Sequence, residues 1–350
     1  MSLRVIIVGT GGMANFHAET FSKIDGVEIV AGIDTNADRL SAFCAKHGIP
    51  HGFSNLEEAL AWGEFDAATN VTPDSVHYMT TMPLLGAGKH VLCEKPLATD
   101  YAQALEMAQA AHKAGVVNMI NLTYRNGACL SHAAKLIAEG AIGEVRHFEA
   151  SYLQSWLTQP AWGEWSTDST WLWRLSTAHG SKGVLGDVGV HILDFATFAA
   201  GSEVSDMSCR LVTFDKAEGG KIGEYVLDAN DSMSMHVRLG NGAMGVIHAS
   251  RFATGHFNDL SLRIFGTKGA IEVKDVKNVS SMRVCLGEDI HGPNWTEVEA
   301  PRTPSIIEKF VDAIRTGKAA EPDFARGAAL QKALDTAVDS DAQNGLSLSV

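Results

Sequence analysis

The first third of the chain alternates short apolar runs with segments of helical period. Turn-forming residues bound these runs, and the alternation is typical of βα units that build a parallel sheet. The predicted strands are Arg4–Val8, Glu28–Ile33, Ala67–Val71, His90–Cys93 and Val116–Asn121. The predicted helices are Met13–Lys23, Arg39–His47, Leu56–Trp62, Val76–Ala87 and Tyr101–Ala114. The pattern predicts a doubly wound α/β domain.

After Leu122, longer alternating segments replace the regular βα units. Ser232–Leu239 alternates apolar and polar residues, and Asn241-Gly242 is a typical turn from it into a second strand, Met244–Ser250. The other predicted elements are the strands Val145–Tyr152, Leu260–Phe265 and Ile271–Lys274 and the helices Cys129–Glu139, Asp187–Ala200, Ser305–Arg315 and Ala325–Asp339. We therefore expect a second domain with a mixed or antiparallel sheet, one face of which is polar.

Length and composition narrow the class of protein. The 350 residues predict two domains, since a typical domain holds about 100–200 residues. Lys and Arg number 28 against 41 Asp and Glu, a net charge of −13, and the basic residues are scattered, so we expect no nucleic-acid partner. No apolar run reaches the ~18 residues of a membrane span. We expect no membrane partner.

The chain start and the cysteines predict a cytoplasmic protein. Met1-Ser2-Leu3-Arg4 lacks the basic and apolar segments of a secretory signal. The five cysteines are widely spaced and contain no C-x-x-C pair, so they are interpreted as reduced thiols.

A glycine-rich loop follows the first predicted strand. Gly9-Thr10-Gly11-Gly12-Met13-Ala14 has the form G-x-G-x-x-A, in which Gly9 permits the tight turn and Gly11 lets the backbone approach a pyrophosphate. The alternative is a turn without a ligand, but Asp34 ends the second strand, where a carboxylate accepts hydrogen bonds from an adenine ribose and repels a 2′-phosphate. Because Thr35 and Asn36 follow instead of Arg or Lys, the sequence favours NAD over NADP. Gly9, Gly11, Gly12, Met13 and Asp34 are the predicted cofactor-binding residues of this region.

Two further segments carry candidate chemistry. Glu94-Lys95-Pro96 brings a lysine to the carboxyl edge of the predicted parallel sheet, although a surface lysine at the start of a loop is the simpler interpretation of this motif alone. If Asp187–Ala200 is helical, Asp187, His191 and Asp194 share one face. This face suits a donor–acceptor pair for a polar substrate, a metal site, or a capping aspartate beside a core histidine. We expect no metal, because no cysteine, H-E-x-x-H motif or further carboxylate cluster supports one.

Taken in order, these motifs resemble the Gfo/Idh/MocA oxidoreductase family. The matching segments are the G-x-G-x-x-A loop with Asp34, Thr72-Pro73-Asp74-x-x-His77, Gly88–Pro96, Tyr124-Arg125, Asp187-x-x-x-His191-x-x-Asp194 and the terminal Phe310–Gly317 and Phe324–Ser340. The resemblance implies an α/β fold: an N-terminal Rossmann domain with a doubly wound parallel sheet (residues 1–122) that binds the dinucleotide, and a C-terminal α+β domain with an open, mostly antiparallel sheet (residues 123–350). The second domain is expected to bind substrate and to form a homodimer or homotetramer through its sheet. Whether the terminal helices pack back on the first domain is left open.

The resemblance also implies an activity, hydride transfer between a hydroxyl or carbonyl carbon of a sugar, polyol or cyclitol and NAD(P). In that family the residues that match Lys95, Asp187 and His191 line the substrate site, and those that match Thr72, Pro73 and Glu94, together with Lys95, lie at the cofactor. Two shorter motifs place His77 near the cofactor and Tyr124 and Arg125 near the substrate.

The residue types suit this chemistry. His191 is expected to act as general base, Lys95 to stabilise the developing alkoxide and Asp187 to position the substrate. The roles of Lys95 and His191 can be exchanged.

A tryptophan-rich segment allows two interpretations. Five of the seven tryptophans fall within eighteen residues: Trp156, Trp162, Trp165, Trp171 and Trp173. They form either a packed loop or subunit contact, or a wall of the sugar site in which Trp162, Trp173 and Arg174 bind the substrate.

Two alternative functions also stay open: a non-catalytic NAD-binding sensor or scaffold on the same fold, and an NAD-dependent glycosidase.

Overall fold

The computed structural model describes residues 2–277 and 279–350. The chain divides into two compact units, the first comprising Met1–Thr123 and Pro304–Gln331 and the second Tyr124–Thr303 and Lys332–Val350.

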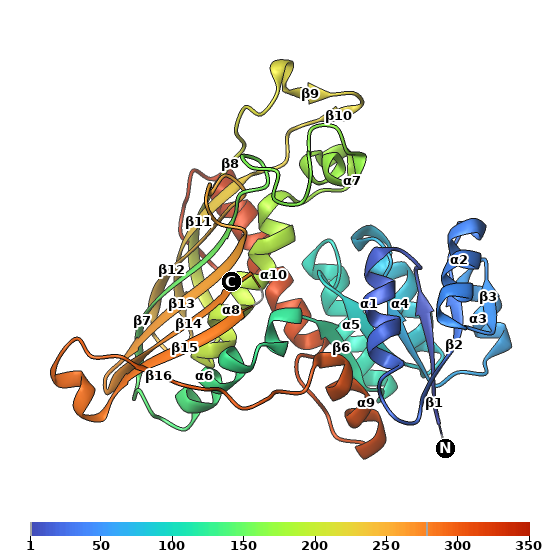
Figure 1. Cartoon of the computed structure of the whole chain (residues 1–350), viewed down its shortest axis with the longest axis horizontal. Helices are drawn as coiled ribbons and strands as arrows, with labels where there is room; N and C mark the ends of the chain where they lie inside the picture. The colour runs from blue at the N-terminus through green and yellow to red at the C-terminus, as the bar shows by residue number, and fades with distance from the viewer. Residues whose placement is uncertain (1, 278) are drawn as a thin grey trace. The chain divides into compact units, whose positions relative to one another are not determined.

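A parallel sheet forms the centre of the first unit (Figure 1). Within the described residues it has six strands in the order β3-β2-β1-β4-β5-β6, and we call it the Rossmann sheet. The strands are β1 (Leu3–Val8), β2 (Val27–Ile33), β3 (His51–Phe53), β4 (Ala67–Asn70), β5 (His90–Glu94) and β6 (Asn118–Asn121). The strand order reverses between β1 and β4, the point at which doubly wound sheets bind ligands at the carboxyl ends of their strands.

Helices cover both faces of the Rossmann sheet, because α1 contacts α2 and α9 while α4 contacts α5. The helices of this unit are α1 (Gly12–Phe21), α2 (Ala37–His47), α3 (Leu56–Trp62), α4 (His77–Gly86), α5 (Tyr101–Ala114) and α9 (Ile306–Thr316). Four of them begin at a side-chain cap and end at a left-handed glycine: α2 at Asn36 and Gly48, α3 at Asn55 and Gly63, α5 at Asp100 and Gly115, and α9 at Ser305 and Gly317. The predicted Rossmann domain is confirmed.

The second unit contains a larger sheet. Across the part of the chain that the structure describes, this sheet has nine strands in the order β16-β15-β14-β13-β7-β12-β11-β8-β17, and we call it the large sheet. Its strands are β7 (Val145–Gln154), β8 (Val204–Val212), β11 (Ser232–Leu239), β12 (Met244–Ser250), β13 (Asn258–Gly266), β14 (Gly269–Val276), β15 (Val279–Leu286), β16 (Thr296–Glu297) and β17 (Leu348–Ser349). Only β7 and β12 pair in parallel among the described strand pairs of this sheet, so the predicted mostly antiparallel sheet is confirmed.

One face of the large sheet is covered by helices α6 (Ala128–Ala138) and α8 (Val190–Ala200). The predicted alternation along β11 is confirmed, since Met235 and Val237 are buried while Ser234, His236 and Arg238 are exposed. The chain also contains α7 (Ser169–Leu172), the long helix α10 (Phe324–Ala342) and a small hairpin of β9 (Lys221–Ile222) and β10 (Tyr225–Val226).

Several elements differ from the sequence prediction. The pattern predicts no strand at β3, β8 or β15, because β3 is three residues long and polar residues such as Asp206 and Arg283 interrupt the alternation of the other two. The helix expected from Asp187 is α-helical only from Val190, and a π-helical turn, η5 (Leu185–Gly189), precedes it. Asp187 therefore lies in a π-helical turn, a feature often found at functional sites.

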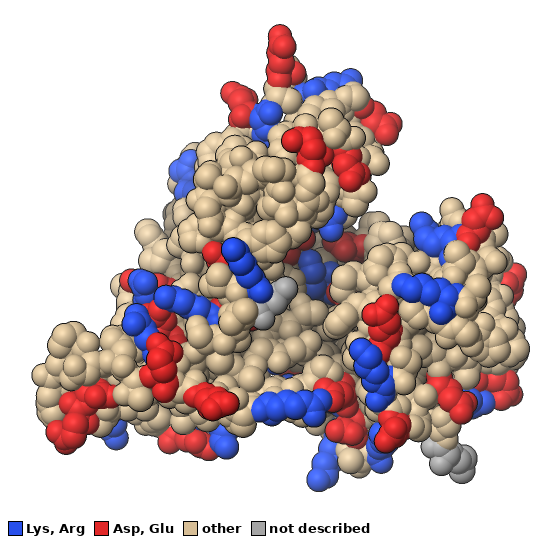
Figure 2. Space-filling view, viewed as in Figure 1, with Lys and Arg blue, Asp and Glu red and all other residues tan. Residues whose placement is uncertain are grey.

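The charges on the surface and the lengths of the helices relate to the predictions about nucleic-acid and membrane partners. Figure 2 shows Lys and Arg side chains interspersed with Asp and Glu on the face that it draws. Within residues 2–277 and 279–350, no helix combines the length and the apolar character that crossing a membrane requires.

Candidate active site

The glycine-rich loop between β1 and α1 has the shape that a phosphate needs. Gly9 has a φ of +87°, and a Cβ atom there would lie 2.7 Å from the carbonyl oxygen of Val71. At Gly11 and Gly12, by contrast, a Cβ atom would meet nothing within 4 Å, and α1 begins at Gly12. The loop thus presents open space beside the N–H groups of a helix start, which fits the pyrophosphate of a dinucleotide. Met13, on the first turn of α1, is exposed.

Asp34 ends β2 in a dense set of hydrogen bonds. Its Oδ2 accepts from the amide and hydroxyl of Thr10, at 2.9 and 2.7 Å, and its Oδ1 accepts from the amide of Asn36 at 2.9 Å. Arg39 on α2 donates to both oxygens, at 2.9 and 2.7 Å. Burial raises the pKa of Asp34, but Arg39, Asn36 and Thr10 outweigh it and hold this pKa well below its ordinary value.

His77 joins the loops that follow β4 and β5. The imidazole is fully buried, with Nδ1 2.7 Å from the carbonyl oxygen of Pro96 and Nε2 2.8 Å from that of Thr72. Because carbonyl oxygens only accept, both ring nitrogens donate and the ring is an imidazolium. Burial lowers the pKa of His77, but Cys93, Asp74 and the Pro96 carbonyl raise it to about 10. His77 therefore holds backbone in place and is not open to a ligand.

Glu94 lies at the end of β5, and two side chains of the same unit bind its carboxylate. His17 Nε2 lies 2.8 Å from its Oε1, and the side chain of Asn121 donates to the same oxygen at 2.6 Å. Burial raises the pKa of Glu94, but His17 and Asn121 outweigh this effect and lower it to about 2. Lys95 follows it, is partly buried and donates its amide to Glu94 Oε2 at 3.2 Å, and the Lys95–Pro96 peptide is cis.

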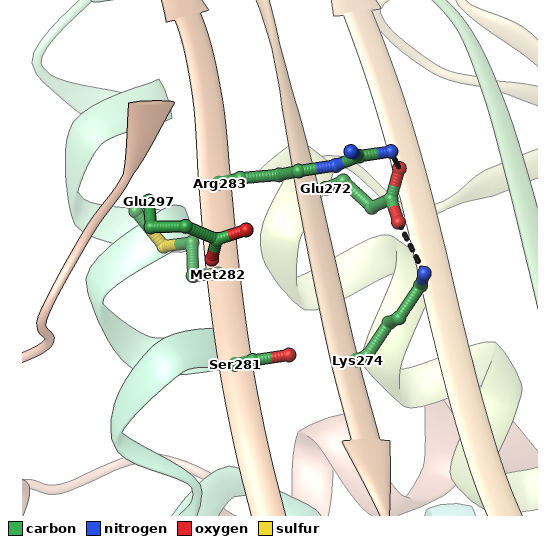
Figure 3. A pocket seen from close by; sticks show the side chains of 6 residues that line it. All are labelled: Glu272, Lys274, Ser281, Met282, Arg283 and Glu297. Carbon is green, nitrogen blue, oxygen red and sulfur yellow. Dashed lines mark hydrogen bonds and ion pairs between the residues drawn. The ribbon is translucent and has the colours of Figure 1, made fainter. Parts of the chain in front are cut away.

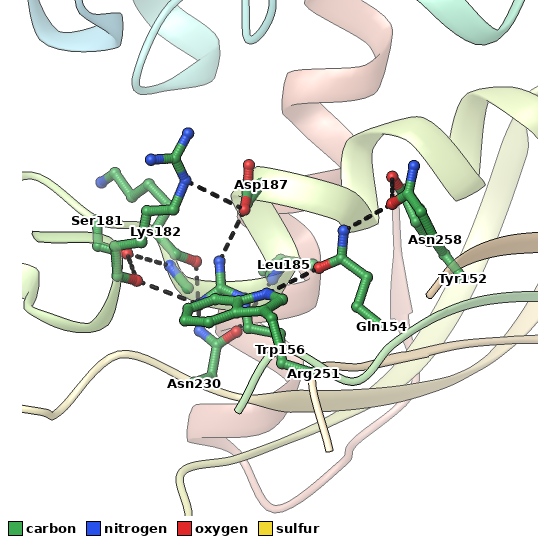
Figure 4. Close-up of polar contacts among 12 residues, drawn as sticks. Tyr152, Gln154, Trp156, Ser181, Lys182, Leu185, Asp187, Asn230, Arg251 and Asn258 are labelled. Atoms are coloured by element: carbon green, nitrogen blue, oxygen red, sulfur yellow. Dashed lines mark hydrogen bonds and ion pairs between the residues drawn. The ribbon is translucent and has the colours of Figure 1, made fainter. Parts of the chain in front are cut away.

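In the second unit, the carboxylate of Asp187 lies beside two arginines, of which Figure 4 labels Arg251. Arg251 donates to its Oδ2 at 2.9 Å, and Arg174 Nε lies 3.9 Å from the same oxygen. The guanidinium of Arg251 is fully buried, lies over the ring of Trp156 and also donates to the carbonyl oxygen of Arg174. The Asp187 side chain keeps 31% of its surface exposed, so its carboxylate is fixed yet accessible.

His191 lies in the first turn of α8, against a pair of tyrosines. The ring edge of Tyr124 packs on it with centroids 5.0 Å apart, and Tyr152 lies 6.5 Å away. The two hydroxyls are 2.5 Å apart, and Asn258 binds both, accepting from Tyr152 at 2.7 Å and donating to Tyr124 at 2.9 Å. Burial is the main cause that raises the pKa of both phenols, so they are neutral.

A row of side chains connects the tyrosine pair with the arginine under Asp187. Gln154 donates to Asn258 at 2.9 Å and accepts from the indole of Trp156 at 3.1 Å, and Trp156 carries Arg251 on its ring (Figure 4). Because each group in the row is hydrogen-bonded or stacked, one network fixes the surroundings of both His191 and Asp187.

The remaining predicted site residues of this unit lie in different surroundings. Arg125 is buried and donates to both oxygens of Asp194, at 2.9 and 2.7 Å, so Asp187 and Asp194 are held by different cations. Trp162 stacks on Trp171 and contacts Phe257 within an aromatic cluster. Trp173 keeps 37% of its surface exposed, with the guanidinium of Arg174 4.6 Å from its ring. In the described ranges, no group of three His, Cys, Asp or Glu side chains is arranged to hold a metal ion.

Comparison with known proteins identifies the family. Residues 3–122 match the sequence model of an oxidoreductase family with an NAD-binding Rossmann fold, and residues 130–272 match that of the GFO/IDH/MocA C-terminal domain. The scyllo-inositol 2-dehydrogenase (NADP(+)) of Bacillus subtilis (strain 168) is 30% identical over 239 residues, 68% of this chain and 70% of that protein. The chain belongs to the GFO/IDH/MocA family.

Other members of the GFO/IDH/MocA family extend the likeness over the whole chain. The 1,5-anhydro-D-fructose reductase of Ensifer adhaerens is 29% identical over 352 residues, 97% of this chain and 98% of the relative. The solved structure of a levoglucosan dehydrogenase in complex with NADH and levoglucosan has a TM-score of 0.88 at 24% identity, covering 100% of this chain and 99% of that one, and shows the same fold. The predicted family, fold, enzyme class and cofactor, NAD, are thereby confirmed.

The structure adds residues that the sequence analysis did not select: Arg39, Tyr152, Gln154, Arg251 and Asn258. For Arg251 the sequence does contain a signal. It continues the alternation of Ile247 and Ala249, the buried positions of β12, and an arginine in such a register needs a carboxylate partner. Tyr152 and Asn258 carry no comparable signal, because only the pairing of β7 with β13 brings them together.

Proposed function

We propose that this oxidoreductase transfers a hydride between a hydroxyl-bearing carbon of a sugar, polyol or cyclitol and NAD. The observation that carries the proposal is the Asp187–His191 pair, in which a carboxylate held by Arg251 and still accessible lies one turn before an imidazole packed on Tyr124. Such a pair can bind a hydroxyl group and accept its proton.

The catalytic residues of this proposal are Lys95, Asp187 and His191. His191 takes the hydroxyl proton, Asp187 orients the hydroxyl, and the ammonium of Lys95 stabilises the negative charge that develops on the oxygen. The nicotinamide, when bound, supplies the acceptor for the hydride. The residues that hold the cofactor are Gly9, Gly11, Gly12, Met13, Asp34, Thr72, Pro73, Glu94 and Lys95, with His77 fixing the loops behind them.

The proposed substrate contacts are made by side chains that are exposed beside Asp187. Trp173 offers an open ring face and Arg174 a guanidinium beside Asp187, so these two side chains bind the sugar together with Tyr124. Arg125 and Trp162 stabilise the site from behind, because their polar and aromatic groups already bind Asp194 and Trp171. In this scheme residues 1–122 bind the cofactor and residues 123–350 bind the substrate.

The proposal includes a homo-oligomer, a dimer or tetramer, formed through the large sheet. On the face opposite α6 and α8, Glu272 is buried between Lys274 and Arg283, each 2.7 Å away, in a shallow polar pocket (Figure 3). In a two-fold dimer the same patch of both copies would meet, so these ion pairs would lie at the interface. The five cysteines are all free thiols, which supports a cytoplasmic location.

A substrate panel tests the function. The full chain is mixed with NAD and, in turn, with aldoses, anhydrosugars, inositols and dihydrodiols, and NADH absorbance is followed. We expect turnover with at least one cyclic polyol or sugar. The relatives named above are dehydrogenases and a reductase, which favours turnover over both alternatives. NADH binding without turnover of any compound would support the sensor, and aglycone release without net NADH would support the glycosidase.

A further inference from the structure

The position of the Asp187 carboxylate depends on the helical turn that carries it. That turn, η5, is a single turn of π-helix over residues 185–189, a rare backbone geometry. The amides at the start of a helix have no partner within it, so groups from elsewhere must bind them. Whatever binds the start of η5 therefore also holds Asp187 in place.

Asn230, in the segment that leads into β11, binds the start of η5 (Figure 4). Its Oδ1 accepts from the amide of Leu185 at 3.0 Å, and its Nδ2 donates to the carbonyl oxygen of Lys182 at 3.3 Å. Its backbone carbonyl oxygen accepts from the amide of Val184 at 2.8 Å. Asn230 thus makes three hydrogen bonds with residues 182–185, from a distant part of the chain.

The side chain of Asn230 also packs closely on the backbone of Gly183. Gly183 has a φ of +66°, and a Cβ atom there would lie 2.5 Å from the Cγ, Nδ2 and Oδ1 atoms of Asn230. A larger residue at position 183 would push the amide away from Leu185, so both the φ and the close approach require glycine. This packing fixes the plane of the amide in addition to its hydrogen bonds.

Asn230 and Arg251 hold Asp187 from two neighbouring strands. β11 and β12 pair in the large sheet, and beyond their paired residues the amide of Arg251 donates to the carbonyl oxygen of Asp231 at 2.9 Å. Arg251 binds the carboxylate of Asp187, and Asn230 binds the backbone turn from which that side chain extends. The two contacts together set the place and the direction of the carboxylate.

We propose that Asn230 is a positioning residue of the reaction. Its side-chain amide supports the π-helical turn and thereby keeps the carboxylate of Asp187 where it can orient the substrate hydroxyl. Asn230 acts through Asp187 and has no part in cofactor binding. The inference rests on the proposed function, because it assigns a role within that reaction.

Hydrogen exchange of the full-length chain, measured without ligand by mass spectrometry, tests the support of the turn. The variants are Asn230→Ala, Asn230→Asp and Asn241→Ala. Asn241 is a matched control, since its amide also supports a turn, the one between the other ends of β11 and β12. We expect the amides of residues 182–190 to exchange about 5-fold faster in Asn230→Ala, the scale of one hydrogen bond, and at the wild-type rate in Asn241→Ala.

The kcat/KM for a substrate from the panel above tests the role in the reaction. Asn230→Ala should lower kcat/KM about 10-fold, the scale of one or two hydrogen bonds, with NADH affinity unchanged. Asn230→Asp should recover part of the loss, because it keeps the acceptor for Leu185. In a double-mutant cycle with Arg251→Met the two losses should not multiply, because both act on the same carboxylate. Asn241→Ala should leave kcat/KM unchanged.

Three results overturn the proposal: unchanged exchange of residues 182–190 in Asn230→Ala, unchanged kcat/KM in that variant, and losses that multiply fully in the double-mutant cycle. All three leave the hydride-transfer function standing. Should Asn230→Ala not fold, the same comparisons are made with Asn230→Asp, the milder variant. If wild type turns over no compound of the panel, the proposed function fails and the role of Asn230 in the reaction fails with it, whatever the exchange of the turn.

Discussion

In the first unit, the loops that follow β1, β4 and β5 are shaped by contacts with backbone carbonyls, whereas in the second unit the groups expected at the substrate are held by other side chains. Gly9 fits against the Val71 carbonyl, and His77 binds the carbonyls of Thr72 and Pro96. Asp187 instead depends on Arg251, and His191 packs on Tyr124. A dinucleotide is the same ligand in many proteins, so its loops can be built from short local motifs. A substrate varies, and its surroundings are assembled from distant segments.

This difference predicts how each unit responds to substitution. Changes in the backbone-held loops are expected to alter folding or cofactor binding, and changes in the side-chain network are expected to alter turnover while the cofactor still binds. The following experiments test that separation.

The largest effect is expected at the two candidate proton-handling groups, one in each unit. Lys95→Met and His191→Asn each keep the approximate size of the side chain and remove its proton chemistry. We expect kcat to fall at least ~10²-fold in both, the usual scale for an acid–base or electrostatic group. NADH affinity should stay nearly unchanged in His191→Asn and should fall much less than kcat in Lys95→Met, because Lys95 is also proposed to contact the cofactor. A base accepts the proton only in its deprotonated form, so the kcat/KM of the wild type should rise with pH. The variant in which this rise disappears identifies the base. Near-normal kcat in either folded variant on the true substrate removes that residue from the mechanism.

Arg251 tests the side-chain network. In Arg251→Met the carboxylate of Asp187 loses its ion pair with Arg251 at 2.9 Å, so we expect kcat/KM to fall roughly 10–100-fold, the equivalent of about 1–3 kcal/mol for a charged hydrogen bond. Arg251→Lys keeps the charge and should recover part of the loss. The control is Arg238→Met, an exposed arginine on the same sheet. If Arg251→Met weakens NADH binding as strongly as it lowers kcat/KM, the assignment of cofactor binding to the first unit and of turnover to the side-chain network of the second is wrong.

The same contrast explains what the sequence could predict. The G-x-G-x-x-A loop, its strand and its helix are contiguous, so their periodicity and glycines identify them, and β11 with β12 is equally local. The network of Tyr124, Gln154 and Arg251 spans more than a hundred positions. Strand pairing brings the ends of β7, β12 and β13 together, and Tyr124 joins them from a 3-10 turn through its hydrogen bond with Asn258. Arg39 was missed for a related reason, since a helix turn returns it to Asp34. For the tryptophans the sequence left two interpretations open, and both stay predictions: Trp162 is partly buried and packs against the cluster, while Trp173 is exposed.

His77 tests the backbone-held loops through pH. Its pKa is raised from 6.5 to about 10 in the folded protein, so its contribution to stability is complete below pH 6.5 and is lost as pH rises towards 10. We expect His77→Gln to lower the free energy of unfolding by about 1–3 kcal/mol near neutral pH. The difference from wild type should shrink as the pH approaches 10. Urea unfolding across this range measures it, with His236→Gln, an exposed histidine of β11, as control. A difference that stays constant with pH would contradict the imidazolium.

The smallest effect is expected at the exposed indole. Trp173 presents an open face beside Arg174, so Trp173→Ala should raise KM about 3–10-fold, the equivalent of an aromatic contact of about 0.5–1.5 kcal/mol, and leave the melting temperature and NADH affinity unchanged. Trp162→Ala is the matched comparison, because its ring packs on Trp171 and Phe257. That variant should lower the melting temperature with little change in KM for the substrate. If the two variants exchange these effects, the sugar contacts Trp162, and the aromatic cluster itself, not its exposed edge, forms the wall of the substrate site.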